Sequence, residues 1–404
     1  MNFGANRSEA VILSAARTPS GGFLGSLSAI PAPKLGAIVV KAVVERAVIN
    51  DPAQINEVLM GNVVSAGLGQ APARQSAILA GLPETVGATT VNKVCGSGLK
   101  TVMLAAQSIR AGDGDLFVTG GMESMSRAPF LVDGRGGSLR FGNAQLTDAL
   151  LFDGLWDPFE NWAMGDSAEF IAEKYGITRQ EMDEYAYESH RKAVAAIDAG
   201  RFKKEIVPVE IQDRKKGRIQ FDTDETPRRD TSLESLTKLR PAFQKDGKVT
   251  AGNAPGLNDG AAALVVASRS KADEMGTTPM ARIEGYTQVA VAPKLLFDAP
   301  ASAIPDLLAK TGWKLEDVDL IELNEAFAAQ VLANGKALRD YGWDWGKVNV
   351  NGGGIALGHP IGASGARTLT TLIYALKDRS LKRGIVALCL GGAEAVAMAV
   401  TVEP

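Results

Sequence analysis

Two short segments near opposite ends of the chain resemble each other, and this likeness constrains the fold more than any other feature. Residues 96–101 read Gly-Ser-Gly-Leu-Lys-Thr, and residues 363–368 read Ala-Ser-Gly-Ala-Arg-Thr. Each opens a stretch with apolar residues at helical spacing, which leads to a glycine pair at Gly120-Gly121 and at Gly391-Gly392. The pattern favours two similar α/β halves over a chance likeness of two short turns.

The two copies differ beyond the glycine pair. In the second copy the chain continues at once into an apolar run at 395–402, whereas a comparable run for the first copy comes only at 262–266. We therefore predict that an insertion interrupts the first half. The predicted domains are residues 1–124 together with 257–278, an inserted loop domain at 125–256, and residues 279–404.

Short apolar runs alternate with amphipathic stretches along both halves. The runs predict strands at 9–15, 115–119, 262–267, 319–323, 348–351 and 385–390. A helical stretch is predicted at 166–199, within the insertion. Near-continuous apolar strands separated by helices are typical of sheets that helices cover on both faces, so the predicted fold class is α/β.

Cysteine and histidine are scarce, which limits the chemistry available to the chain. Its 404 residues are enough for two or three domains but include only two Cys and two His. These numbers argue against a disulfide scaffold and a cysteine-rich zinc site, so we expect no metal. Unpaired cysteines fit a reducing compartment, and we expect a cytoplasmic protein.

Charge and hydropathy narrow the range of partners. The chain has 43 basic and 46 acidic residues, and the net charge of −3 argues against a nucleic-acid binder. The longest apolar run falls short of the ~20 residues of a membrane-spanning helix, and the first residues do not resemble a signal peptide. Residues 201–240 carry eleven Lys or Arg and eight Asp or Glu, which suits a solvated surface or a patch for a phosphate-bearing ligand.

Three of the four rare residues stand in glycine-rich turns. Cys95 directly precedes a predicted helix, whose positive N-terminal end would favour a thiolate. Cys389 ends a predicted strand, and His359 lies in a glycine-rich loop that occupies the same place in the second half as Cys95 does in the first. Packing of the halves would make Cys95 and His359 a nucleophile and base, although buried structural cysteines remain an alternative. His190 lies among charged residues and is predicted to be on the surface.

Four motifs in this order resemble those of the thiolase family. They are Asn-x-x-Cys-x-Ser-Gly around Cys95, Asn-Glu-Ala-Phe at Asn324, Gly-His-Pro-x-Gly-x-Ser-Gly around His359 and Cys-x-Gly-Gly at Cys389. The resemblance covers essentially the whole chain. It implies the five-layer α-β-α-β-α thiolase fold, with two duplicated halves and a loop domain inserted in the first.

The resemblance also implies a role for each site residue. Cys95 is similar to the nucleophile that becomes acylated, His359 to the base that takes its proton, and Cys389 to the second acid/base, which acts on the α-proton of acetyl-CoA. The backbone N–H groups of Cys95 and Gly391 would form one oxyanion hole. His359 and a water held by Asn324 would form the other.

The implied reaction is acyl transfer between coenzyme A (CoA) thioesters. It would run as condensation of two acetyl-CoA to acetoacetyl-CoA or as thiolysis of 3-ketoacyl-CoA, in fatty acid metabolism. CoA would be substrate or product, with no permanently bound cofactor. Arg228 matches a position at the adenine nucleotide of CoA and Ser235 a position lining its site, and Met164 and Phe327 would contact the substrate. A homo-oligomer, dimer or tetramer, is expected.

Some positions depart from the family pattern. Ala163 stands where many members have His, Pro255 replaces a frequent serine, and Ala393 replaces a third glycine. Residues 296–300 read Leu-Phe-Asp-Ala-Pro in place of Met-Gly-x-Gly-Pro. These departures bear on CoA contacts and acyl-chain preference.

Two other classes of protein remain open: a Cys/His hydrolase, which would give Cys389 and Asn324 no role, and a non-catalytic acyl-CoA-binding relative.

Overall fold

Ten strands of the protein form one hydrogen-bonded sheet in the order β14-β15-β16-β13-β1-β12-β5-β3-β4, with β2 paired to β12, and the strand pairs β6-β7, β8-β9 and β10-β11 lie outside it. The computed structural model describes residues 9–403, apart from 137, 138, 140, 214 and 216. The first half of the sheet contains β1 (Ala10–Arg17), β2 (Gly21–Gly22), β3 (Glu57–Gly61), β4 (Gly87–Val91), β5 (Leu116–Ser124) and β12 (Asn258–Ser268). The second half contains β13 (Ala281–Ala290), β14 (Leu320–Leu323), β15 (Arg383–Leu390) and β16 (Glu394–Val402).

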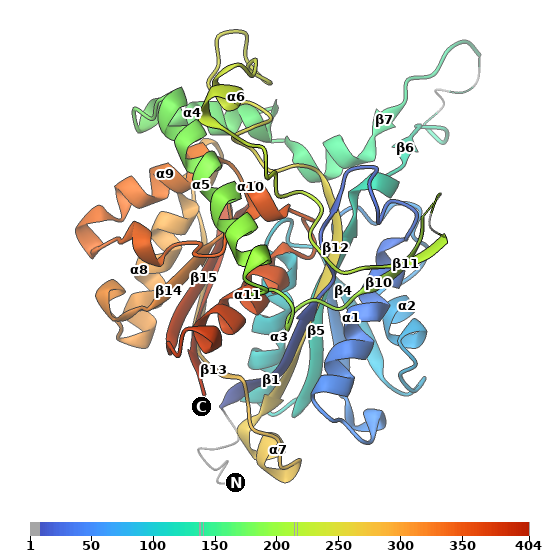
Figure 1. Cartoon of the computed structure of the whole chain (residues 1–404). Helices are drawn as coiled ribbons and strands as arrows, with labels where there is room; N and C mark the ends of the chain where they lie inside the picture. The colour runs from blue at the N-terminus through green and yellow to red at the C-terminus, as the bar shows by residue number, and fades with distance from the viewer. Residues whose placement is uncertain (1–8, 137–138, 140, 214, 216, 404) are drawn as a thin grey trace.

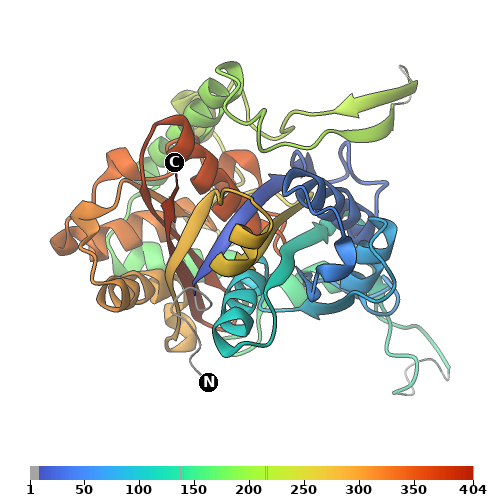
Figure 2. The ribbon, with the colours of Figure 1, turned by 90° about the horizontal axis from the view of Figure 1, so that it is seen from below.

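A short pairing of β1 with β13, over Val11 and Ile12, joins the two halves. Helices α3 (Ser97–Ala111) and α11 (Ser364–Asp378) lie between the halves and share one apolar core with residues of both (Figure 2). The glycines of the two similar segments permit this packing. A Cβ on Gly98 would lie 2.8 Å from Ala366 N, and a Cβ on Gly365 would lie 2.4 Å from Leu99 N. The two helices therefore cross with their backbones close together.

Further helices cover the outer faces of the sheet. Helices α1 (Ala32–Arg46) and α2 (Pro72–Leu79) pack on the first half, and α8 (Ala299–Thr311) and α9 (Ala328–Ala337) pack near the second (Figure 1). Helix, sheet, helix, sheet and helix make the five layers that the sequence predicts. Short elements complete the halves: α7 (Arg269–Glu274), α10 (Gly354–Leu357), Pro52–Gln54, Met125–Arg127, Pro293–Asp298, Leu315–Asp317, Arg339–Tyr341 and Trp345–Lys347.

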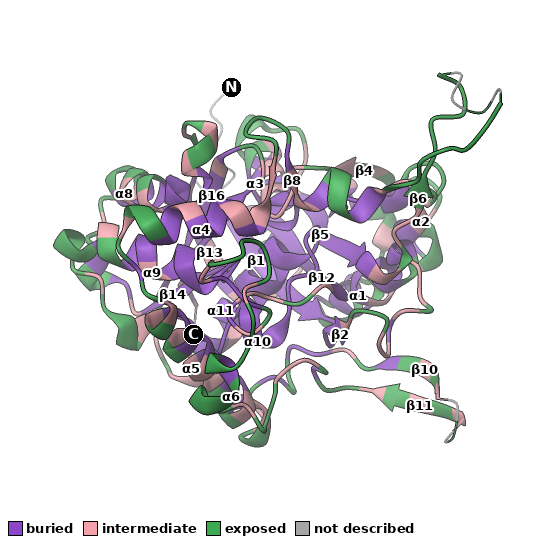
Figure 3. Ribbon diagram, turned by 90° about the horizontal axis from the view of Figure 1, so that it is seen from above, coloured by how far each residue is buried: buried purple, intermediate pink, exposed green. Residues whose placement is uncertain are grey.

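The segment between β5 and β12 lies mostly over one end of the sheet (Figures 1 and 3). Two exposed hairpins project from it. Residues of its helix α4 and of its turn η4 line the same cavity as Cys95 and His359. Its elements are β6 (Phe130–Leu131), β7 (Thr147–Asp148), the π-helical turn η4 (Leu150–Leu155), β8 (Trp156–Asp157), β9 (Trp162–Ala163), α4 (Met164–Lys174), α5 (Arg179–Asp198), β10 (Val209–Asp213), β11 (Gly217–Phe221) and α6 (Leu233–Thr237).

Two secondary-structure predictions are corrected. The strand expected at 348–351 does not form, because Asn349 takes a left-handed conformation (φ 45°) and its side chain bonds both the N–H and the C=O of Leu323. The helix expected at 166–199 is two helices, α4 and α5. Gly176 breaks it with φ 59°, and Thr178 and Glu181 then form a capping box that starts α5.

A buried ionic cluster ties the inserted segment to the first half. The guanidinium of Arg17, at the end of β1, is fully buried and bonds Glu205 at 2.6 Å and Asp224 at 2.7 and 2.8 Å. Both carboxylates belong to the segment 201–240, whose acidic residues therefore do not all lie on a solvated surface. The cluster satisfies charges that would otherwise be very costly to bury.

We predict that Arg17→Met strongly destabilises the protein, because it leaves two buried carboxylates without a counter-ion. The free energy of unfolding should fall by about 3–5 kcal/mol in chemical denaturation. Arg229→Met is the matched control, since Arg229 pairs with Asp198 on the surface and its loss should hardly change stability. Equal effects of the two substitutions would contradict a structural role for the buried cluster.

Candidate active site

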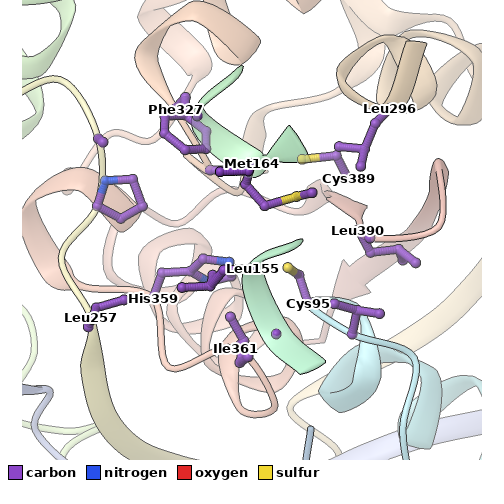
Figure 4. Close-up of a pocket in the computed structure, with 18 of the residues that line it drawn as sticks. Cys95, Leu155, Met164, Leu257, Leu296, Phe327, His359, Ile361, Cys389 and Leu390 are labelled. Carbon is purple, nitrogen blue, oxygen red and sulfur yellow. The ribbon is translucent and has the colours of Figure 1, made fainter. Parts of the chain in front are cut away.

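Cys95, His359 and Cys389 point into one cavity of about 160 Å³ at the N-terminal ends of α3 and α11 (Figure 4). The sequence predicts that these three residues meet, and the structure brings them together. Gly391, Met164 and Phe327 also line the cavity. The remaining lining is almost entirely apolar, and it includes Met125, Leu151, Leu155, Phe243, Leu257, Leu296, Phe297, Ile361 and Leu390.

A strained turn presents Cys95 to the cavity. Val94 has a left-handed backbone (φ 46°), which a β-branched residue rarely adopts. Ser97 holds this turn: its Oγ accepts a bond from Lys93 N at 2.8 Å and donates one to Val94 O at 2.6 Å. The strain therefore persists because neighbouring hydrogen bonds over-determine the turn.

Burial dominates the protonation of Cys95. It raises the pKa of the thiol to about 12, although backbone N–H groups of Gly391 and Cys95 donate to the sulfur and act in the opposite direction. The positive end of helix α3 favours a thiolate at Cys95, but desolvation outweighs it, so the thiol needs a base to ionise. The same two N–H groups can donate hydrogen bonds to the oxyanion that forms when a thiolate attacks a thioester carbonyl.

The ring orientation of His359 is set by Ser364, in the first turn of α11. Ser364 Oγ donates its proton to Pro360 O at 2.9 Å, so it accepts from His359 Nδ1 at 2.6 Å. Nε2 then carries the lone pair and can accept a proton. Burial, followed by the charge of Arg367, lowers the pKa of His359 to about 3, so the resting imidazole is neutral.

Cys389 ends β15 opposite Cys95, and its environment also favours the thiol. Burial raises its pKa well above the ordinary value, and negative charge on Cys95 raises it further. The proton affinities of the two sulfurs are therefore coupled, because ionisation of either thiol disfavours ionisation of the other.

Asn324 directly follows β14 and is buried, two residues before Ala326, which lines the cavity. Within the described residues, neither Oδ1 nor Nδ2 of Asn324 has a hydrogen-bond partner. Buried amides are normally satisfied, so this side chain needs a water or a ligand. The structure does not place Asn324 on the cavity surface itself.

Two buried carboxylates, which are not among the predicted site residues, hold the loops of the site. Glu123 accepts bonds from the N–H groups of Val63, Val64 and Gly362, and burial raises its pKa to about 7. It anchors the loop after His359 to the first half. Its position two residues after the Gly120-Gly121 pair was the available signal.

Glu325 performs the same task in the second half. It accepts bonds from Tyr185 Oη at 2.9 Å, Ser189 Oγ at 2.7 Å, Asn349 Nδ2 at 3.0 Å and Ile355 N at 2.9 Å. The carboxylate thereby joins helix α5 to the loop that leads to His359. Its adjacency to Asn324 in the Asn-Glu-Ala-Phe motif was the signal in the sequence.

The residues expected to contact CoA divide into two groups. Met164 and Phe327 line the cavity, whereas Arg228 and Ser235 are exposed on the inserted segment and do not line it.

The prediction that His190 lies on the surface is wrong. His190 is buried, its Nδ1 accepts a bond from Arg228 N at 3.2 Å, and burial lowers its pKa to about 4. It therefore supports the backbone of the loop that carries Arg228.

The departures from the family pattern also have defined places. Ala163 and Pro255 line the cavity, as do Leu296 and Phe297. Phe297 packs against Phe327, with ring centroids 5.5 Å apart. Ala393 lies outside the cavity and has a left-handed backbone (φ 59°), which a glycine would adopt without strain.

Comparison with known proteins identifies the family. The chain matches the thiolase N-terminal domain over residues 10–270 and the thiolase C-terminal domain over residues 277–402. An acetyl-CoA acetyltransferase of Pseudomonas aeruginosa is 53% identical over 390 residues, covering 96% of this chain and 98% of the relative. One of Cupriavidus necator is 53% identical over 392 residues, covering 97% and 99%.

Solved structures agree with these matches. The crystal structure of the Bacillus anthracis acetyl-CoA acetyltransferase has a TM-score of 0.94 and 42% identity, covering 99% of this chain and 100% of the other. The chain belongs to the thiolase family, and its fold is the thiolase fold.

Among the described residues, no cluster of three or more His, Cys, Asp or Glu is suited to a metal, and no helix is long and apolar enough to cross a membrane.

We predict that the rate constant for alkylation of Cys95 by iodoacetamide, measured without substrate, keeps rising at pH values where the rate constant of an ordinary thiol has already levelled off. Because the pKa of Cys95 is raised to about 12, the rate constant should rise roughly tenfold per pH unit from pH 7 to 10 without levelling. Mass spectrometry of digests reports the modified residue, and free glutathione is the control. A plateau near pH 8.5 would contradict the raised pKa.

Proposed function

We propose that the chain is an acyltransferase that moves acetyl groups between CoA thioesters, through an acyl-enzyme on Cys95. It condenses two acetyl-CoA to acetoacetyl-CoA or cleaves a 3-ketoacyl-CoA with CoA. The convergence of Cys95, His359 and Cys389 in one cavity carries this proposal, and the names of the relatives support it. CoA is a substrate or product.

The first half-reaction acylates Cys95. Nε2 of His359 takes the thiol proton, and the thiolate sulfur attacks the thioester carbonyl. The N–H groups of Cys95 and Gly391 stabilise the oxyanion. As the carbonyl re-forms, the C–S bond to CoA breaks and Cys389 donates its proton to the leaving CoA sulfur. This leaves Cys389 as a thiolate after the charge on Cys95 has been removed.

The second half-reaction makes the carbon–carbon bond. The Cys389 thiolate removes an α-proton from a second acetyl-CoA, and the enolate oxygen is held by protonated His359 and a water on Asn324. The unpartnered amide of Asn324 supports this assignment. The enolate carbon attacks the acyl carbonyl, Cys95 leaves as thiolate, and His359 returns the proton to it. Thiolysis follows the same steps in reverse.

We further propose short acyl groups as preferred substrates. The cavity is small, and three aromatic rings, Phe243, Phe297 and Phe327, stand in its wall. Phe297 occupies a position where many members have glycine, and its side chain fills space there. Arg228 and Ser235 would meet the nucleotide portion of CoA, outside the cavity. Residues 125–256 would act as the loop domain that receives it.

We also propose a cytoplasmic homo-oligomer, a dimer or tetramer, active in fatty acid metabolism. Strand β4 is the last strand in the sheet order, with only β3 beside it, and could pair with a second copy. The β6–β7 hairpin projects from the body and exposes Phe130, Phe141 and Leu146 (Figure 1). Two separate exposed surfaces would suit a tetramer.

We predict that Cys95→Ser abolishes formation of the acetyl-enzyme. A serine hydroxyl has a far higher pKa than a thiol, so neutral His359 cannot ionise it effectively. Intact-mass spectrometry after mixing with acetyl-CoA should show the added acetyl group on the unmodified protein and no addition on the variant. Normal acylation of the variant would overturn the proposed nucleophile.

We predict that Cys389→Ser separates the two half-reactions. The variant should still acylate Cys95, whereas exchange of the acetyl α-protons with deuterated solvent should fall by about 10²–10⁴-fold, the range for loss of a general base. Unchanged exchange would remove Cys389 from its role. Release of free acetate without acetoacetyl-CoA from the unmodified enzyme would instead favour a thioester hydrolase.

A further inference from the structure

Arg367, on α11, is a buried cation with no direct partner. Its side chain is 2% exposed, and Nε, Nη1 and Nη2 all lack a hydrogen-bond partner within the described chain. A guanidinium has five N–H donors, and burying it without acceptors would be very unfavourable. The site must therefore contain acceptors that the protein itself does not supply.

The acids whose charges act on Arg367 are Glu322, Glu205 and Asp224. Glu205 and Asp224 already bond Arg17 directly, which leaves Glu322 for Arg367. Glu322, on β14, is 2% exposed, and Arg367 is the strongest charge acting on it. In the described structure no nitrogen of Arg367 reaches an oxygen of Glu322 within 4.0 Å.

The acidity of Glu322 bears on what fills the gap. Burial raises the pKa of Glu322 to about 8, although the positive charge of Arg367 acts in the opposite direction, so near pH 7 Glu322 is largely protonated. Water can donate to Glu322 and accept from Arg367, and bridging water is nearly as favourable as a direct bond.

Both residues stand close in sequence to groups of the proposed reaction. Arg367 lies one helical turn after Ser364, which holds the ring of His359, and Glu322 lies two residues before Asn324 on the same face of β14. Helix α11 and strand β14 pack together. A link between the pair thus spans the two loops that carry His359 and Asn324.

We propose that ordered water bridges Arg367 to Glu322, and that this hydrated pair of side chains is a positioning device which fixes His359 relative to Asn324. The inference rests on the roles proposed above for those two residues. Neither Arg367 nor Glu322 touches the cavity. Their effect is therefore on the alignment of the catalytic groups rather than on binding of CoA.

The first test is a crystal structure of the unmodified protein at a resolution that shows ordered water. We expect at least one water within hydrogen-bond distance of both the Arg367 guanidinium and the Glu322 carboxylate. A direct Arg367–Glu322 contact, a dry gap, or a chloride on Arg367 would each overturn the proposal. This test does not depend on activity, so it is separate from the Cys95→Ser test of the proposed function.

The second test compares Arg367→Met and Glu322→Gln with the double variant, in condensation and thiolysis assays. Misalignment should lower kcat of each single variant about tenfold to hundredfold with KM for acetyl-CoA little changed. The double variant should lose no more than either single variant, since the pair acts as one unit. Multiplicative losses, or unchanged kcat in a folded Glu322→Gln protein, would overturn the proposal.

Arg379→Met is the matched control, because Arg379 lies at the C-terminal end of the same helix and bonds Asn351. It should keep the kcat of the unmodified enzyme. Arg367→Lys, which retains a buried cation able to hold water, should recover part of the loss seen with Arg367→Met. If Arg367→Met does not fold, the isosteric Glu322→Gln and the crystal structure decide the question.

Discussion

The close crossing of α3 and α11 is the constraint on which the rest of the structure depends. Gly98 and Gly365 leave no room for a Cβ between the helix backbones. Because each helix starts directly after a loop that bears a reactive side chain, the crossing brings Cys95 and His359 to one cavity. The two sheet halves and the outer helices are layers around this contact.

Burial then sets the chemistry of the site. Desolvation raises the pKa of Cys95 to about 12 and lowers that of His359 to about 3, so sulfur holds the proton and the imidazole is neutral in the resting protein. An ionised pair of Cys95 thiolate and His359 imidazolium would be energetically unfavourable in this apolar pocket. In the proposed reaction, the substrate would provide a carbonyl oxygen for the two N–H donors, and proton transfer would become favourable only when negative charge can move onto that oxygen.

Behind the cavity, buried polar groups hold the loops in place. Glu123 accepts backbone N–H groups from two separate segments, and Glu325 joins helix α5 to the loop that leads to His359. Asn324 and Arg367 are unsatisfied by protein atoms, which indicates internal water. The precision of the site is thus a property of hydrogen bonds between segments far apart in the chain.

The sequence alone predicted the α/β class, the two similar halves and the meeting of Cys95, His359 and Cys389, because turn glycines, helical spacing and rare side chains are local signals. The catalytic roles of these three residues stay predictions. Only the tertiary structure decided that residues 348–351 form no strand, that His190 is buried and that the Cys95 thiol stays protonated. The domain boundaries and the CoA contacts of Arg228 and Ser235 stay predictions. Side-chain bonds such as Asn349 to Leu323, and desolvation itself, depend on what the rest of the chain packs against a residue. The environment of a residue is set by the fold and cannot be inferred from the residues next to it in the sequence.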